Sequence, residues 1–230
     1  MKIADFFNKY QGRYAEKKHR STLKSIARWV DYYHYSYSPE ELPSLLLSES
    51  VKLKEFLSNN PNSADELLPK VYAIFSETAR LFFGYSLNKV QLLGAILLWK
   101  GKAVEMKSGE GKTLTAAMAA YLQGLTGRGM HVITTNDYLA ERDREWMNNL
   151  FSRLSVSCGA ITQNTTSETR KKEYAKDITY VANQEIGFDY LRDNLVTSEN
   201  DKVLRGFPFA IIDEIDSILI DEARTPLIIS

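Results

Sequence analysis

The feature that most constrains this chain is an eight-residue stretch, Met106-Lys-Ser-Gly-Glu-Gly-Lys-Thr113. It follows a short apolar run, Ala103–Met106, that is typical of a strand, and it precedes a helix-like run, Thr113–Leu122. Gly109 and Gly111 allow a tight turn, so the backbone N–H groups and the positive end of the next helix point at one place. A loop of this kind between a strand and a helix is typical of a phosphate-binding site.

The residue types in this loop predict a nucleotide as the ligand. Lys112 is placed to reach the β- and γ-phosphates, and the Thr113 hydroxyl is placed to bind Mg²⁺. The strict motif requires glycine where Met106 stands, so the match is to the helicase-type variant of the loop. A Gly-Lys turn without a ligand is the alternative. The predicted nucleotide-binding residues of the loop are Gly109, Glu110, Gly111, Lys112 and Thr113.

A second motif, Phe209-Ala-Ile-Ile-Asp-Glu-Ile-Asp216, is an apolar run that ends in adjacent carboxylates. This pattern places an acid at the carboxyl end of a buried strand. Asp213 is predicted to hold Mg²⁺ through water, and Glu214 is predicted to polarise the attacking water as general base. Such a cluster alone is more often a solvated helix start. The upstream phosphate loop favours the metal site, because P-loop triphosphatases divide the work between strands in this way.

Four blocks of sequence extend these two motifs. The blocks are Met106–Leu114, Thr135–Asp143, Ile178–Asn194 and Asp213–Ser230. Together, and in this order, they resemble the signature blocks of the bacterial SecA preprotein translocase ATPases. The resemblance is strong over residues 85–230 and general over the first 84. It implies an α/β fold, with a RecA-like P-loop domain at 85–230 after a helical segment at 1–84, and it puts the insertion of the family's peptide-crosslinking domain just after Ser230.

The resemblance also implies an activity and its partners. It implies a motor that uses ATP and Mg²⁺ to drive preproteins through a protein-conducting membrane channel. The chain would be cytoplasmic and peripherally associated with the inner face of the membrane, with an anionic lipid surface as a further partner and no nucleic acid. A homodimer is left open. The cationic finger arginine of the family belongs to a second RecA-like domain, and no arginine here resembles it, so the chain alone is expected to be poorly active.

Further residues have a role only through this resemblance. Gln91 resembles the glutamine that reads adenine, and the plain alternative is a glutamine on a helix surface. Asp137, Arg142 and Asp143 resemble a motif that couples the nucleotide site to the polypeptide path, and the alternative is a solvated helix capped by Asn136. A last set can equally be a structural polar network. That set is Asp189, Arg192, Asp193 and Asn194.

Two other functions remain as alternatives. A nucleic-acid helicase of the same superfamily shares the phosphate loop and the acids, but Gly187–Asn194 and Thr225–Ile229 resemble translocase blocks and contain no base-reading residues. A non-catalytic ATP-binding fragment is the other alternative, because the second RecA-like domain is missing from these residues.

Composition is consistent with one α/β domain and a helical extension. The chain has 230 residues, of which 44% are hydrophobic and 25% charged, with a formal net charge of zero. No apolar stretch approaches the length of a spanning helix, and the first residues do not resemble a signal peptide. Cys158 lies in an apolar run and is expected to be a small core residue. The three histidines, His19, His34 and His131, are too scattered to predict a metal cluster.

Periodicity predicts three helices followed by an alternation of strands and helices. The first helix runs to about Tyr35, the second has a capping box from Ser38 to Glu41 with Pro39 at its first position, and the third begins at Ser63 after a loop at 59–62. The strands are expected near 103–106, 131–135, 156–161, 178–182 and 208–213. Such alternation favours a parallel sheet with helices on both faces.

The N-terminal segment is basic and has an apolar face. The first 28 residues carry eight lysines and arginines against two acids. The apolar face consists of Ile3, Phe6, Phe7, Tyr10 and Tyr14. A helix of this kind can lie on an anionic membrane, or its aromatic face can pack on the nucleotide domain. The tyrosine-rich run Tyr32–Tyr37 is expected to pack at a helix end rather than to stack on bases.

Overall fold

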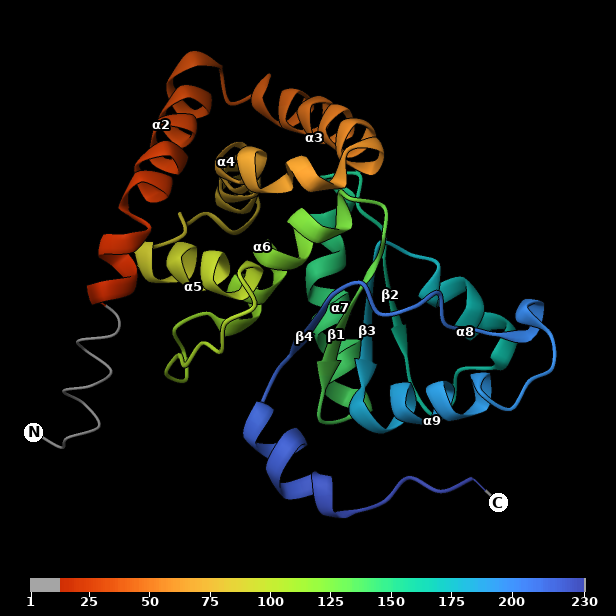
Figure 1. Ribbon diagram of the computed structural model, residues 1–230. Helices are drawn as coiled ribbons and strands as arrows, with labels where there is room; N and C mark the ends of the chain where they lie inside the picture. Colours follow the sequence, from red (N-terminus) through yellow and green to blue (C-terminus); the bar gives the residue numbers. More distant parts are fainter. Residues whose placement is uncertain (1–12, 230) are drawn as a thin grey trace, which may run out of the picture.

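A computed structural model describes residues 13–229, in which a layer of helices covers a parallel sheet (Figure 1). The sheet has four parallel strands in the order β2-β3-β1-β4, so β2 and β4 lie at its edges. β3 is buried along its whole length, as expected for an interior strand of a sheet that is covered on both faces. The strands are β1 (Met130–Thr134), β2 (Cys158–Ile161), β3 (Ile178–Ala182) and β4 (Ala210–Ile212).

Helices cover both faces of this sheet. The step from β1 to β2 crosses the sheet in the opposite direction to the steps from β2 to β3 and from β3 to β4. Right-handed crossovers therefore put α7 (Asp137–Ser152) on one face and α8 (Ser167–Tyr174) and α9 (Asn183–Asp193) on the other. α6 (Lys112–Gly124) packs on the same face as α7 (Figure 1). The predicted α/β class is confirmed.

One of the predicted strands, at 103–106, is wrong. Residues 102–107 are not part of any strand. Apolar spacing reports which side chains are buried, but a strand also needs a ladder partner. Val104 and Met106 instead pack beside Gly94 of α5 (Lys89–Trp99), where an added Cβ would lie 3.5 Å from Met106 Sδ and 3.8 Å from Val104 Cγ1.

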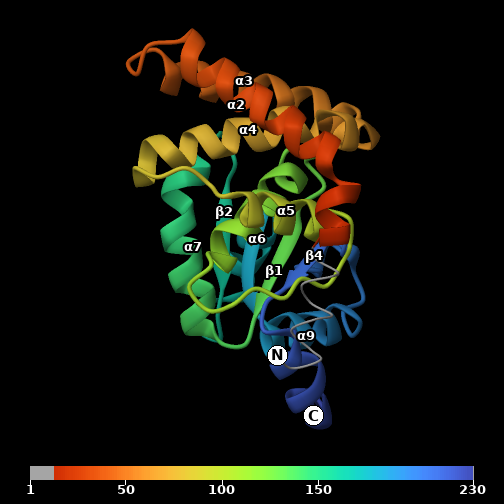
Figure 2. The same ribbon diagram turned by 90° about the vertical axis from the view of Figure 1, so that its left-hand side faces the viewer.

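The N-terminal part of the described chain is helical, as predicted. Figure 2 shows α2, α3 and α4 together above the sheet. Ser38 and Glu41 form the predicted reciprocal capping bonds, each 3.3 Å long, but residues 39–41 form a turn and the helix begins only at Leu42. The helices are α2 (Arg20–Ser36), α3 (Leu42–Asn59) and α4 (Ala64–Phe83), with a 3₁₀ turn at Pro61–Ser63.

Aromatic side chains pack against one another at the end of α2. Trp29 stacks on Tyr33, with ring centroids 6.0 Å apart, and Tyr33 is buried. Tyr32 and Tyr37 meet edge to face, and their hydroxyl oxygens are 2.8 Å apart. This confirms packing at the helix end for these residues, although Tyr35 is 80% exposed.

The predicted apolar face of the N-terminal segment lies mostly outside the described residues. Ile3, Phe6, Phe7 and Tyr10 belong to the part that is not described, and Tyr14 is 64% exposed. Both interpretations of this segment stay open. No described helix is long and apolar enough to cross a membrane.

The helical layer and the sheet layer share one hydrophobic core. Phe75 of α4 packs against Tyr121 of α6 and Phe151 of α7, with ring centroids 5.7 and 6.5 Å apart. Ser50 of α3 lies beside this contact, where its hydroxyl is 2.7 Å from that of Tyr121 and donates to the Leu154 carbonyl at 2.5 Å. The domain boundary at residue 84 stays a prediction. The same hydrophobic core includes residues on both sides of it.

Two titratable side chains of the sheet, Cys158 of β2 and His131 of β1, are buried. Burial raises the pKa of the Cys158 thiol to about 11, so the predicted role as a small core residue is confirmed. Burial and the nearby Arg205 lower the pKa of His131 to about 4, and its Nδ1 has no partner in the described structure. His131 is therefore a neutral imidazole at pH 7, packed against Tyr174 and Phe207.

A charged contact ties α3 to the end of the sheet. Lys54 Nζ donates to Asp177 Oδ2 at 2.6 Å and to the Ser155 carbonyl at 3.0 Å. The same Asp177 oxygen accepts the backbone N–H and the hydroxyl of Ser157, both at 2.8 Å. Asp177 thus satisfies three donors at the junction of the two layers.

Replacing Asp177→Ala should lower the free energy of unfolding by about 2–3 kcal/mol, because partly buried donors lose their acceptor. Urea denaturation measures this difference. Glu168→Ala is the matched control, since its ion pair with Lys172 is exposed and should contribute less than about 0.5 kcal/mol. Equal losses for the two variants would contradict a special role for the junction.

Candidate nucleotide-binding site

The predicted phosphate loop forms a closed turn in front of α6. Gly109 and Gly111 have φ angles of 83° and 87°, in the left-handed region that favours glycine. Lys107 and Glu110 close the turn, because the Glu110 N–H donates to the Lys107 carbonyl at 3.2 Å and the Glu110 carboxylate accepts the Lys107 N–H at 2.9 Å. α6 begins at Lys112, so its free N–H groups lie directly at the loop.

Gln91 supports this loop from α5. Its amide oxygen accepts the Asn88 N–H at 3.0 Å in a capping box, and its Nε2 donates to the Glu110 carbonyl at 3.1 Å. A Cβ at Gly111 would lie only 2.2 Å from Nε2. Gln91 is 7% exposed, so the interpretation as a helix-surface residue is wrong. No local pattern in the sequence indicates the contact of Gln91 with Glu110 and Gly111.

The predicted acids lie at the carboxyl ends of the strands. Asp213 follows β4, and its N–H donates to the Ile133 carbonyl of β1 at 2.9 Å. Glu214 adopts a left-handed φ of 51°, and its N–H donates to Asp213 Oδ1 at 2.9 Å. The Thr135 hydroxyl donates to the Glu214 carboxylate at 3.4 Å. The turn after β4 therefore orients both carboxylates at the end of β1.

α7 brings a further ion pair near Asp213. Arg142 donates to Asp143 Oδ1 through Nε at 2.9 Å and through Nη2 at 2.7 Å. Burial raises the pKa of Asp143, and the negative charge of Asp213 adds to this effect. The predicted Asn136 cap is present, with Leu139 N–H at 3.0 Å, but Asp143 is 4% exposed rather than solvated.

The Asp137 carboxylate points away from that pair. It accepts the Gln163 backbone N–H at 2.9 Å, at the start of the loop after β2. Of the three residues predicted to couple the nucleotide site to the polypeptide path, the structure therefore joins only Arg142 and Asp143 to each other.

Asp189 and Arg192, for which a structural polar network was one interpretation, lie in such a network together with Arg170, which was not predicted from the sequence. Arg170 donates to Asp189 at 2.7 Å and to Glu185 at 2.5 Å. The Tyr174 hydroxyl donates to the same Asp189 oxygen as Arg170, at 2.8 Å, and Arg192 donates to the other oxygen at 3.0 Å. In the sequence Arg170 stands in a run of charged residues, and no sequence feature distinguishes this buried arginine from its exposed neighbours.

Asp193 and Asn194 extend this structural role. The Asp193 carboxylate accepts the backbone N–H groups of Val203 and Leu204, at 2.9 and 2.8 Å. The Asn194 amide donates to the Tyr190 carbonyl at 2.7 Å. Both residues fix the path of the chain between α9 and β4.

The loop and the acids together suit a nucleotide with Mg²⁺. Lys112 is exposed, and within residues 13–229 it forms no ion pair. A Cβ at Gly109 would meet nothing within 4 Å, so the loop face is open. The Thr113 hydroxyl and the Asp213 carboxylate are the hard oxygen ligands that Mg²⁺ prefers. In the described residues no hydrogen bond or ion pair joins Lys112 or Thr113 to the acids.

Comparison with known proteins agrees with this geometry. A family model described as the SecA DEAD-like domain matches residues 6–230. The protein translocase subunit SecA of Finegoldia magna is 46% identical over 94% of this chain and 24% of its own length. That of Treponema denticola is 51% identical, over 93% and 23%, and the chloroplastic subunit of Spinacia oleracea is 55% identical, over 73% and 16%.

The chain thus spans about a quarter or less of the length of these relatives. The matched region contains the glycine loop in front of α6, the capped helix α7 and the paired acids after β4. On this evidence the chain belongs to the SecA DEAD-like domain family.

Proposed function

We propose that this chain is the ATP-binding motor part of a SecA-type protein translocase, which couples ATP binding and hydrolysis to preprotein export across a membrane. The observation that carries the proposal is the glycine loop at the start of α6, with Gln91 packed beneath Gly111. The relatives reported above are named protein translocase subunits, which supports a translocase over a nucleic-acid helicase.

Each site residue has a separate task in this proposal. The loop N–H groups and Lys112 bind the phosphates, while Thr113 and Asp213 hold Mg²⁺. Mg²⁺ held by these two residues would neutralise charge on the phosphate oxygens. Glu214 accepts a proton from the attacking water, and its left-handed backbone and the Thr135 hydroxyl hold its carboxylate at the end of β1.

Gln91 reads the adenine base in this proposal while it supports the loop. Its two observed hydrogen bonds use one N–H and one lone pair of the amide oxygen. A second N–H and a second lone pair remain for the adenine edge. Base recognition and loop support are therefore compatible in the same side chain.

The proposed partners are preproteins, the protein-conducting channel and an anionic lipid surface, and the location is the cytoplasmic face of the membrane. Exposed basic residues at the start of the described chain support the lipid contact, since Lys17, Lys18 and Arg20 all face solvent. The proposal needs no nucleic acid and leaves a homodimer open.

Lys112→Ala should weaken ATP binding by at least about tenfold, because a charge-assisted contact to the phosphates is lost. Titration with a fluorescent ATP analogue measures the affinity. Lys172→Ala is the control, since that lysine is exposed on α8 and should leave binding unchanged. Equal affinities of wild type and Lys112→Ala would refute the site.

Gln91→Ala should reduce the preference for ATP over GTP by about 1–3 kcal/mol, because an amide oriented to pair with the adenine edge loses this pairing when guanine replaces adenine. It should also weaken binding of both nucleotides, since the Glu110 carbonyl loses its donor. Competition between GTP and ATP tests this, with exposed Gln163→Ala as the control. Weaker binding with an unchanged base preference would leave Gln91 with loop support alone.

The chain alone should bind ATP and hydrolyse it only slightly above background. A cationic finger commonly contributes ~10³–10⁵ in rate, and no arginine here resembles the family's finger. Adding the downstream part of a relative should restore a rate that Glu214→Gln abolishes. A translocase-like rate from the chain alone, abolished by Glu214→Gln, would show that the catalytic site is already complete within these residues.

A further inference from the structure

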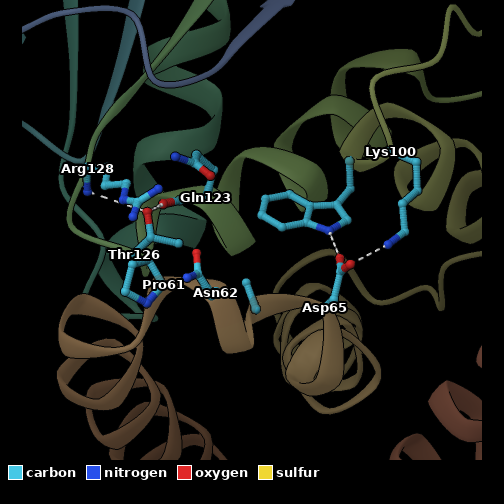
Figure 3. Close-up of a pocket in the computed structure, with 9 residues that line it drawn as sticks. Pro61, Asn62, Asp65, Lys100, Gln123, Thr126 and Arg128 are labelled. Carbon is cyan, nitrogen blue, oxygen red and sulfur yellow. Dashed lines mark hydrogen bonds and ion pairs between the residues drawn. The ribbon is translucent and has the colours of Figure 1, made fainter.

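A cavity lies at the other end of α6 from the phosphate loop (Figure 3). Its volume is about 370 Å³, within the range of small-molecule sites. It opens where the start of α4 and the ends of α5 and α6 meet. Its main polar and aromatic lining residues are Asp65, Trp99, Lys100, Gln123, Thr126 and Arg128.

Gln123 presents an unused acceptor to this cavity. The residue is 5% exposed, and its Nε2 reaches the Gly129 carbonyl only at 3.5 Å, the outer limit of a hydrogen bond. Its Oε1 accepts no hydrogen bond from residues 13–229. An amide oxygen that no protein donor uses can accept a hydrogen bond from a bound molecule that carries an O–H or N–H group.

Arg128 supplies an unused cation on the same wall. Within the described chain its guanidinium makes no hydrogen bond or ion pair, and only its backbone N–H is used, toward the Thr126 hydroxyl. Figure 3 shows Gln123, Thr126 and Arg128 together on this wall. A guanidinium binds a carboxylate through two parallel hydrogen bonds.

The opposite wall limits the charge of the molecule that fits. Asp65 is paired there, because Lys100 Nζ and Trp99 Nε1 each donate to its carboxylate at 2.6 Å. These donors, Lys100 foremost, lower the pKa of Asp65, so its carboxylate stays ionised and neutralises the charge of Lys100, which leaves Arg128 as the cation for a ligand with one negative charge. Trp99, Pro61 and Ala64 add apolar surface.

We propose that this cavity binds a small α-hydroxy or α-amino carboxylate with an apolar side group. Its carboxylate pairs with Arg128, and the neighbouring O–H or N–H donates to Gln123 Oε1. The apolar group lies against Trp99. The site is separate from the phosphate loop and does not depend on the proposed ATPase activity.

The three tryptophans of the chain allow a direct test in the ¹⁵N-labelled protein. L-mandelate is the probe, and phenylacetate, which lacks only the hydroxyl group, is its matched control. At constant ionic strength mandelate should shift the Trp99 indole N–H resonance in a saturable way. Phenylacetate should bind at least about tenfold more weakly, because Gln123 Oε1 stays without a donor.

Variants separate this site from general charge effects. Arg128→Gln should weaken mandelate binding about tenfold or more, whereas Arg153→Gln, an exposed arginine over Phe82 at the far end of α4, should not. Gln123→Leu should make mandelate bind as weakly as phenylacetate. The proposal is overturned if mandelate leaves Trp99 unchanged, if both acids bind wild type equally, or if Arg128→Gln binds like wild type.

Discussion

The burial of α6 is the constraint on which the rest of the structure depends. Almost all of its side chains after Thr113 are buried, including Met118, Tyr121 and Leu122. A helix that is apolar all round must be enclosed, and α6 is enclosed by α4, α5, α7 and the sheet. Its alanines let these neighbours approach closely. The phosphate loop is therefore attached to a helix that is packed on all sides, which holds the loop N–H groups in place without a ligand.

The departure of the loop from the strict glycine motif has a physical explanation. Gly111, which the strict motif requires, and Gly109, which it does not, both have left-handed backbones, and at Gly111 the Gln91 amide also leaves no room for a Cβ. Neither a left-handed backbone nor a close contact with Gln91 constrains position 106. The Met106 side chain packs beside Gly94 of α5, so a large residue is accommodated where the motif has glycine. The two glycines of this loop stand at the positions where its backbone geometry favours glycine.

Much of the fold could be predicted from local sequence, and the misses share one cause. Strands β1 to β4 have an apolar pattern within their own segments, and helix α7 has its own N-cap, so local sequence predicts these elements. The contact between Gln91 and Glu110, the burial of Asp143 and the central place of Arg170 arise from residues that tertiary packing brings together. The strand predicted at 103–106 is wrong for the same reason, because apolar spacing does not show whether a partner strand is present.

The position of β4 at an edge of the sheet affects how the chain behaves at high concentration. β4 pairs with β1 on one side, and its other side has no ladder partner among residues 13–229. An open edge offers backbone donors and acceptors to a second chain. The formal net charge is zero at pH 7, so long-range repulsion does not keep two chains apart. β4 has only three residues, so this edge offers few backbone groups to a second chain.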